Sequence, residues 1–416
     1  MAPTASRGLL ATARDGSPRV AFVSGRDVVI ARRRGIERWT YARVGRVPGS
    51  SPVLAGLVVD ARGRPSVLVE AEDGAWLALV RPGAKLRVVA RPRKGGSLGP
   101  AGLTLDSAGR PAFAYALRLA SAKSWLRLVT VDARGRLHTH GITKGGFPSS
   151  VIAPGAAPVL VGRTLHVVET YTSAAIDWGP KRGGGWEGQF IFGSVRGTPQ
   201  GRVGAAFLAP TLWSAWTQVT PELGAIDVVL ASSAATQESF FLTHGLFVAL
   251  APNPGDAQPE VAANDWIELG ERSFAYAGLV IRGAGSEAWQ LDGRLDGLAI
   301  ARDGSHQLLL SRGFGLEWFR APGLLPPIEL RPGPVDASGR LSGSVVGAST
   351  GVVQVYREVA NAERRLAATS PVGPDGSFTV SGLSSDPDAI YRVTYDDPAT
   401  GIPFGFLPGV AVGVSG

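Results

Sequence analysis

The sequence predicts an all-β chain, and three features support that prediction. Gly and Pro account for 56 and 30 of the 416 residues, a turn-rich composition without a collagen-like period. Hydrophobic residues make up 44% of the chain and charged residues 18%, as in a globular protein. A turn sequence also recurs every 46 to 48 residues, each time between short apolar runs rich in β-branched residues.

The recurring turn explains how each pair of strands would be joined. In its copies, Asp can bond the turn backbone, Gly can take a positive φ, and Pro can open the following strand. The last copy mirrors the first at a distance of 288 residues, or six periods of 48. The clearest copies are ARDGSPRVAF, DARGRPSVLV, DSAGRPAFAY and ARDGSHQLLL, at residues 13–22, 60–69, 106–115 and 301–310.

Each repeat contains four apolar strand candidates, which in the second repeat are residues 54–60, 65–71, 75–80 and 86–90. Four strands in 40–50 residues is the size of a β-propeller blade. Residues 1–330 are therefore predicted to form about seven four-stranded blades, the first three beginning near Gly8, Leu54 and Gly102. Six blades is the alternative, because the repeat near residue 250 is weak. The fourth strand of the last blade is expected at 326–332.

A second, smaller unit is expected at the C-terminus. Residues 331–340 contain two prolines and two glycines and are interpreted as a linker. Strand-like segments follow at 341–346, 352–357, 365–372, 377–383, 391–396 and 409–414, with a hairpin turn at 373–378. Residues 341–416 are therefore predicted to pack as a separate small β-sandwich.

This C-terminal part resembles a known module. The segments VVQVYRE, RRLAATSPVGPDGSFTVSGL and YRVTYDDPATGIPFGFLPGVAV are similar to the carboxypeptidase-regulatory-like, transthyretin-like β-sandwich. Versions with this ending resemble modules appended to tailed-bacteriophage proteins, and the same domain type decorates secreted bacterial enzymes and adhesins. The resemblance covers about 80 residues and implies a bacteriophage tail component.

Composition excludes some chemistry and suggests a location. The chain has no cysteine, which excludes disulfides, thiolate metal sites and cysteine nucleophiles. The N-terminus, MAPTASRGLLATARDGSPRV, has no signal-peptide apolar core, and no membrane span is expected. A fold of extracellular style without a signal peptide fits a virion protein made in the host cytoplasm, so a place in the phage tail is expected.

The net charge of +8 is unevenly distributed along the chain. Residues 1–150 contain 25 Lys and Arg against 9 Asp and Glu, whereas residues 151–330 contain 11 against 17. If blades follow chain order, one sector of the ring is basic. An acidic neighbouring subunit or an anionic cell-surface polymer is favoured as its partner. Nucleic acid is disfavoured, because there is no recognition helix and no RNA-binding aromatic signature.

No sequence motif indicates a catalytic centre. G-x-S-x-G, Walker and H-E-x-x-H sequences are all absent, so neither an enzyme nor a cofactor is expected. His138 and His140 would lie on one face of a strand at metal-ligand spacing. A surface strand is favoured over a metal site, and none is predicted. His306 stands where Pro18 stands in the first repeat, which indicates a structural role.

The most unusual insertion is YTSAAIDWGPKRGGGWEGQF at 171–190, which is expected to project as an exposed loop. Its Trp178, Lys181, Arg182 and Trp186 are the candidate binding residues. Aromatic and basic side chains together suit stacking on sugars or packing against a partner protein. The alternative is that one or both tryptophans pack into a blade.

These observations lead to a functional hypothesis and two alternatives. The hypothesis is a non-enzymatic, structural or host-contacting component of a bacteriophage tail: a tail-tip, baseplate or minor tail protein. Its partners would be other tail subunits in a multimeric assembly, together with a host cell-surface polysaccharide or anionic polymer. The alternatives are a glycan-processing propeller enzyme, sialidase-like or lyase-like, and a bacterial surface or scaffold propeller.

Overall fold

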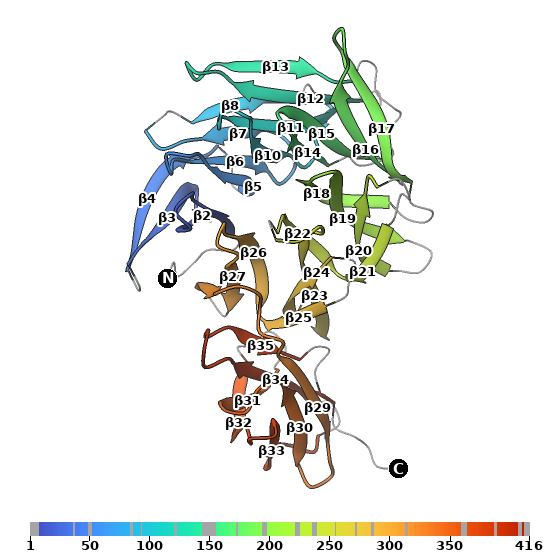
Figure 1. Ribbon diagram of the computed structural model, residues 1–416. Coiled ribbons are helices and arrows are strands. Elements are labelled where there is room, and N and C mark those ends of the chain that lie inside the picture. Colours follow the sequence, from blue (N-terminus) through green and yellow to red (C-terminus); the bar gives the residue numbers. More distant parts are fainter. Residues whose placement is uncertain are drawn as a thin grey trace.

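The computed structural model contains β-strands and turns, and no helix among the residues that it describes. None of these residues therefore forms a helix long and apolar enough to cross a membrane. The predicted all-β class and β-propeller architecture are confirmed (Figure 1). The described residues are 8–35, 38–48, 52–83, 86–92, 94–119, 123–143, 155–171, 174–193, 198–220, 225–234, 239–253, 255–270, 273–283, 287–312, 315–358, 364–386, 389–406 and 410–411.

The first four blades are antiparallel sheets whose four main strands follow chain order, and blade three has a short fifth strand. Blade one contains β1 (Gly8–Thr12), β2 (Pro18–Ser24), β3 (Asp27–Arg34) and β4 (Arg38–Arg46). Blade two contains β5 (Pro52–Val59), β6 (Pro65–Ala71), β7 (Leu77–Val80) and β8 (Arg87–Ala90). Blade three contains β10 (Gly102–Leu105), β11 (Pro111–Arg118), β12 (Ser124–Val131) and β13 (Leu137–Gly141), with β9 (Ser97–Leu98) paired to β11. Blade four contains β14 (Ala156–Val161), β15 (Thr164–Tyr171), β16 (Ala174–Pro180) and β17 (Trp186–Gly193).

Three further blades complete the ring. Blade five contains β18 (Thr198–Leu208), β19 (Thr211–Thr220), β20 (Ala225–Ser232) and β21 (Ser239–His244). Blade six contains β22 (Leu246–Ala251), β23 (Glu260–Gly270), β24 (Ser273–Arg282) and β25 (Glu287–Asp292). Blade seven contains β26 (Arg294–Ile300), β27 (His306–Arg312) and β28 (Gly315–Ala321), which are its strands among the described residues.

The ring closes between blades seven and one. The first strand of each blade lies beside the first strand of the next, and β26 lies beside β1 (Figure 1). A Cβ on Gly297 would come within 2.8 Å of the Leu10 Cβ, so glycine allows these two strands to approach. The Gly8 amide also donates to Oδ2 of Asp296 at 3.2 Å. Each pair of adjacent blades shares a buried apolar cluster, such as the one around Phe22 and Leu309 at the closure.

The recurring turn has the geometry that its sequence predicts. Oδ1 of Asp60 accepts from the amides of Arg62 and Arg64 at 2.9 Å each, while Gly63 has a φ of 75°. Pro65 then opens β6. The same Asp-to-amide bonds recur at Asp106, Asp132 and Asp336. At Asp60 and Asp106 this turn aligns the first two strands of a blade, which explains the regular repeat, whereas at Asp132 it joins β12 to β13 and at Asp336 it joins β29 to β30.

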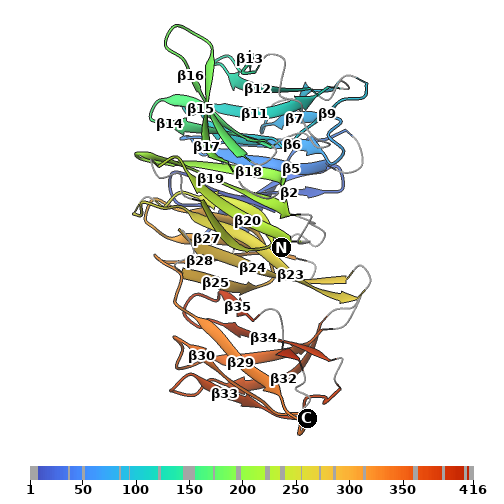
Figure 2. The ribbon, with the colours of Figure 1, turned by 90° about the vertical axis from the view of Figure 1, so that its right-hand side faces the viewer.

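The C-terminal part forms two small sheets below the ring (Figure 2). One contains β29 (Glu329–Val335), β30 (Leu341–Val346) and β33 (Ser377–Val380). The other contains β31 (Val352–Arg357), β32 (Arg365–Pro371), β34 (Ile390–Asp396), β35 (Pro403–Gly405) and β36 (Val410–Ala411). Buried side chains of both sheets belong to one cluster, which includes Val345, Val355 and Phe378.

Two expectations about the junction were wrong. Residues 326–332 do not supply a fourth strand to blade seven, and 331–340 is not wholly a linker. Instead β29 pairs with β30, because the apolar Leu330 and Val335 are buried in the C-terminal cluster. Only the end of 331–340 is a turn. The identification of residues 341–416 as a carboxypeptidase-regulatory-like sandwich stays a prediction.

The C-terminal part is also less separate than expected. Strand β35 pairs with β25, the last strand of blade six, at Phe404 and Leu291. The sheet of blade six therefore continues into the C-terminal part (Figure 2). Side chains from blades six and seven, including Trp289 and Leu308, share its buried cluster. The physical reason is that a terminal strand leaves backbone hydrogen-bonding groups unpaired, and β35 covers them.

Candidate functional site

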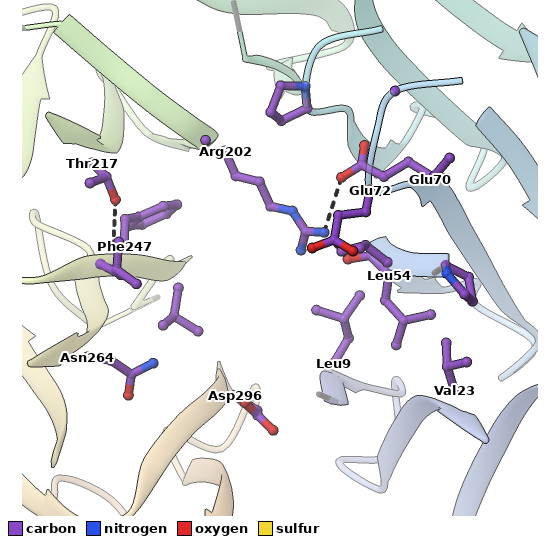
Figure 3. Close-up of a pocket in the computed structure, with 18 of the residues that line it drawn as sticks. Leu9, Val23, Leu54, Glu70, Glu72, Arg202, Thr217, Phe247, Asn264 and Asp296 are labelled. Atoms are coloured by element: carbon purple, nitrogen blue, oxygen red, sulfur yellow. Dashed lines mark hydrogen bonds and ion pairs between the residues drawn. The ribbon is translucent and has the colours of Figure 1, made fainter. Parts of the chain in front are cut away.

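A central pocket of about 1050 Å³ lies where the first strands of several blades meet. Its lining comes from blades one, two, five, six and seven and from residues 97–100 (Figure 3). Polar side chains from positions far apart in the sequence converge on it: Glu70, Glu72, Arg202, Thr217, Asn264, Arg294 and Asp296. The ring thus assembles a composite site that no single repeat contains.

Arg202 crosses this pocket. It leaves β18 in blade five and reaches blade two, where its guanidinium contacts the backbone carbonyl of Leu54. The same guanidinium lies 3.3 Å from Oε1 of Glu70 (Figure 3). Oε2 of Glu70 accepts the Ala101 amide at 3.1 Å. One arginine therefore links two non-adjacent blades through the space between them.

Glu70 is a carboxyl in a partly dry environment. Burial raises the pKa of the Glu70 carboxyl, although Arg202 and the Ala101 amide act in the opposite direction. Its side chain is 13% exposed and that of Arg202 is 28% exposed, so both can be reached from the pocket. Glu72 is exposed and points into the same opening (Figure 3). The pair and Glu72 together offer hydrogen-bond donors and acceptors to a ligand.

The opposite wall is built from groups that already have partners. Asp296 accepts from Nε of Arg294 at 2.9 Å and from the Ser311 hydroxyl at 2.6 Å. Asn264 donates to the Leu295 carbonyl and accepts the Leu295 amide, at 2.8 and 2.7 Å. The Asn264 contacts join blades six and seven, and the Gly8 amide, which donates to Asp296, joins blade one to this wall. This wall therefore serves mainly to hold the ring together.

Apolar side chains complete the lining. Leu9, Leu54, Phe247 and Tyr276 come from blades one, two and six. The Phe247 amide donates to Oγ1 of Thr217 at 2.8 Å, which fixes the start of β22 against blade five (Figure 3). A pocket with apolar walls and a few convergent polar groups is typical of small-molecule binding sites.

The segment expected to be an exposed loop, 171–190, is mostly a β-hairpin. Strands β16 and β17 pair from Ala174 to Gly193 and project from the ring (Figure 1). Lys181 and Arg182 lie exposed at its turn, where Gly183, Gly184 and Gly185 all have positive φ. The pattern of alternating apolar residues on both sides of KRGGG could have indicated this hairpin.

The two tryptophans of this hairpin are half-buried. Trp178 and Trp186 pack against the apolar cluster between blades three and four. The Trp178 indole donates to Oε2 of Glu169 at 3.1 Å. The structure thus separates the four candidate residues into a packed aromatic pair and an exposed basic turn. Their role in binding stays a prediction.

The histidines make pairwise contacts. His138 lies 3.1 Å from the Asp132 carboxylate. His140 instead contacts Thr130, and His166 contacts Asp177 at 3.0 Å. No group of three His, Asp or Glu side chains suited to a metal ion occurs in the described part of the chain. His306 is buried, as its structural interpretation required.

The basic N-terminal sector is partly neutralised. Arg64, Arg110 and Arg136 pair with the aspartates of their own turns at 2.7–2.8 Å. The region where β3 meets β4 contains four arginines, Arg32, Arg33, Arg34 and Arg38. Arg91 and Lys94 lie apart from that group, beyond β8, while Arg93 lies outside the described residues.

Sequence comparison provides no relative for this chain. No family model matches it, and no curated protein matches it. Among solved structures, the Aleuria aurantia lectin has a TM-score of 0.42 at 14% identity, covering 76% of this chain and 93% of the lectin. AofleA from Arthrobotrys oligospora has a TM-score of 0.45 at 11% identity, covering 77% and 90%.

A Hadza microbial sialidase is a third similar structure. Its TM-score is 0.42 at 13% identity, and the alignment covers 63% of each chain. The neighbours therefore include proteins named as lectins and proteins named as enzymes. At these identities and scores, the likeness does not transfer a ligand or a reaction to this chain. The function has to be argued from its own residues.

Proposed function

We propose that the chain is a non-enzymatic binding protein whose central pocket holds a carbohydrate. The observation that supports this most directly is the Arg202–Glu70 pair, which faces the pocket beside Glu72. Planar guanidinium and carboxylate groups form paired hydrogen bonds with adjacent hydroxyls, while the C–H face of a sugar packs on apolar side chains. Leu54, Phe247 and Tyr276 supply such apolar surface.

The charge of the pocket narrows the class of sugar. Glu70, Glu72, Asp73 and Asp296 line it, against Arg202 and Arg294. Carboxylates therefore outnumber guanidiniums by two. A neutral or amine-bearing sugar is compatible with this field, whereas a carboxylated or sulfated sugar would be repelled.

A place in a bacteriophage tail is the finer part of this proposal. It rests on the resemblance of residues 352–412 to modules of tailed-phage proteins, and no comparison adds to it. In that setting the central pocket would contact a host surface glycan, and the chain would be one subunit of the tail. The virion would be its location. Detection of the chain in purified phage particles by mass spectrometry tests this part.

A glycan-binding experiment tests the pocket. Wild-type protein is screened on an array of neutral, amine-bearing and acidic glycans, and each hit is measured by calorimetry. Arg202→Met is expected to weaken binding of the hit by about tenfold or more, since a lost charged hydrogen bond costs about 1.5–3 kcal/mol. Arg331→Met is the control, because its pair with Glu329 is exposed and far from the pocket. Binding confined to acidic glycans, or unaffected by Arg202→Met, would contradict the proposal.

A glycan-processing enzyme is the second candidate, and Glu70 is the observation that favours it. A carboxyl whose pKa is raised by burial at a pocket wall has the property of a general acid. Incubation with the bound glycan, followed by mass spectrometry of the products, separates the two functions. Cleavage that disappears in Glu70→Gln would favour the enzyme. Unchanged glycan over many hours would favour the binding protein.

A further inference from the structure

The outer turn of a blade, which joins its third and fourth strands, lies at the same end of the ring in blades one to four. Successive strands of these blades are antiparallel, so the outer turn shares an end with the turn between the first two strands. First strands of neighbouring blades lie side by side, and the Ala101–Ala156 bridge between blades three and four is parallel. Nη1 of Arg87, in the outer turn of blade two, donates at 3.4 Å to the Gly135 carbonyl in that of blade three. The four outer turns therefore form a row along one end of the ring.

This row of turns is basic. It contains nine Lys and Arg against two Asp and Glu, whereas the corresponding turns of blades five and six, at 233–238 and 283–286, contain none against one. The Lys and Arg of the four turns are called the basic arc. The turns are residues 34–38, 81–87, 132–136 and 181–185.

Most of the basic arc has no acidic partner in the described part of the chain. Two of its members form ion pairs there: Arg136 lies 2.8 Å from Asp132, and Lys181 lies 3.8 Å from Glu187. The other described members form no ion pair with a described residue. The arc thus keeps positive charge that a ligand can neutralise.

Two members of the arc are held where they repel each other. Arg34 and Arg38 are exposed and lie directly opposite across β3 and β4, a placement that destabilises a sheet when both residues carry the same charge. They face blade two, because Ile30, on the same face of the sheet, packs in one cluster with Val67. An external anion at the boundary between blades one and two would relieve this repulsion.

The composition and curvature of the arc indicate the kind of anion. None of the exposed large apolar side chains of the described residues lies in these turns, whereas a folded partner protein is anchored by such side chains. The turns contain no aromatic residue, which disfavours single-stranded nucleic acid, because its bases stack on aromatic rings. Duplex DNA, with a persistence length of about 50 nm, does not follow a curve the size of one domain. A flexible polymer with a charge on successive units fits the arc.

We propose that the basic arc binds an anionic polysaccharide, whose chain runs along the outer turns from blade one to blade four. Guanidinium groups form paired hydrogen bonds with carboxylate, sulfate or phosphate groups on such a chain. No residue of the arc lines the central pocket, whose excess of carboxylates repels acidic sugars. The ring would then have two separate sites, for sugars of different charge.

Polymer length and charge test the arc. The probe is fluorescein-labelled decagalacturonate, and fluorescence anisotropy measures its binding to the full chain at about 50 mM salt. It is expected to bind at least about tenfold more tightly than digalacturonate, because the longer chain reaches several outer turns at once. Neutral dextran should not bind, and dextran sulfate distinguishes sulfate from carboxylate as the preferred group. Equal binding of the two lengths, or tighter binding of a DNA duplex or of polyglutamate, would overturn the proposal.

Removal of charge tests the position of the site. Arg34→Ser, Arg134→Ser and Arg182→Ser together take one exposed arginine from each of blades one, three and four. This triple variant is expected to weaken decagalacturonate binding by about tenfold or more, and to flatten its dependence on salt concentration. Circular dichroism checks that the variant is folded.

Two controls complete the test. Arg46→Ser, Arg91→Ser and Lys94→Ser together remove the same charge from exposed sites at the opposite end of blades one and two, and should weaken binding much less. Arg202→Met should leave polymer binding unchanged, because Arg202 lies in the central pocket. Equal losses in the two triple variants would show that net charge alone attracts the polymer. Loss of binding in Arg202→Met would place the polymer in the pocket, and either result would contradict the proposal.

Discussion

His306 and Glu260 form an ion pair inside the protein: Nε2 of His306 lies 2.7 Å from Oε2 of Glu260, and their side chains are 1% and 0% exposed. Glu260 opens β23 in blade six, and His306 opens β27 in blade seven. Nδ1 of His306 lies 2.6 Å from the Gly323 carbonyl. Because both ring nitrogens face acceptors, both donate, and the imidazole is held as its cation. The pair joins two blades and explains why histidine replaces the proline of other repeats.

The first prediction concerns the pH dependence of this pair. Burial alone would lower the pKa of His306, but the hydrogen bonds and charge of Glu260 outweigh it and raise the pKa above 6.5. The charged imidazole therefore contributes its whole stabilisation of the fold below pH 6.5, and this contribution is lost as pH rises through the folded-state pKa. We expect His306→Gln to reduce the free energy of unfolding by about 3–5 kcal/mol at pH 6, and by less at higher pH.

Urea unfolding at pH 6 to 9 measures this difference. His140→Gln is the control, because His140 is exposed on β13 and no comparable loss is expected there. A loss for His306→Gln that stays constant over the whole range would show that its charge does not contribute.

The second prediction concerns the contact between the ring and the C-terminal part. Asp292 ends β25 and is 1% exposed, and its two oxygens lie 2.5 and 2.7 Å from the guanidinium of Arg364. Arg312 and Arg392 lie 3.3 and 3.5 Å away. Replacing the buried anion by Asn would remove the carboxylate that Arg364 contacts, whereas Arg312 would keep Glu317 and Arg392 would keep Glu358 as partners. We expect a loss of about 3–5 kcal/mol and faster hydrogen exchange at β25 and β35.

The pH dependence of this second variant should differ from that of the first. Burial alone would raise the pKa of Asp292, but Arg364 and the other two arginines outweigh it and lower the pKa. The stability it provides is therefore present above the unfolded value of 3.8 and is lost only as pH falls through the folded-state pKa. Unfolding at pH 5 to 9 should give a constant difference from wild type. A difference that vanishes near neutral pH would be inconsistent with this pair.

Much of the fold could be predicted because it depends on local chemistry. Asp60, Gly63 and Pro65 specify a turn within six residues, so the repeat and the blade boundaries follow from the sequence. Strand β1 begins at Gly8 and β10 at Gly102, as expected, while β5 begins at Pro52 rather than Leu54. The end of blade seven could not be predicted in this way. Residues 329–335 have an apolar strand pattern that suits either blade seven or β30, and only packing decides between them.

The central pocket could not be predicted because its residues come from separate repeats. Glu70 is the last residue but one of β6 and Arg202 lies 132 positions later, so no motif connects them. A charged residue directly after the buried Val67–Val69 was the available signal, since an isolated buried carboxylate is unfavourable and needs a partner. The sequence instead favours residues 171–190 as a binding site, because their tryptophans, basic residues and glycines lie close together in the chain.

The third prediction tests the turn that defines the repeat. Asp60 bonds two backbone amides and the Arg64 side chain, whereas Asp73 bonds one amide, that of Ala75. Asp60→Ala is expected to cost about 1–2 kcal/mol, because side-chain oxygens that satisfy turn amides are worth about as much as a helix cap. Asp73→Ala should cost less than half of that. Thermal unfolding of the two variants provides the comparison. Equal losses of stability would show that the Asp60 turn does not stabilise its blade more than an ordinary turn does.

The last prediction concerns Glu169, whose carboxyl group accepts the hydrogen bond of the Trp178 indole. Glu169 is 3% exposed, and burial raises the pKa of its carboxyl to about 7, although the Trp178 hydrogen bond acts in the opposite direction. The pKa of this carboxyl is higher in the folded state than its unfolded value of 4.5. The protonated carboxyl therefore stabilises the folded state fully below pH 4.5, and this stabilisation is lost as pH rises through 7. Relative to wild type, Glu169→Gln should therefore be similar at pH 5 and more stable at pH 8.5, by up to about 3 kcal/mol. Chemical unfolding at the two pH values measures this, with Glu187→Gln on the exposed strand β17 as the control. The wild-type fluorescence should also titrate near pH 7, and Trp178→Phe should remove that transition. A wild type as stable as Glu169→Gln at pH 8.5 would mean that Glu169 ionises without cost, and that Trp178 is held by packing alone.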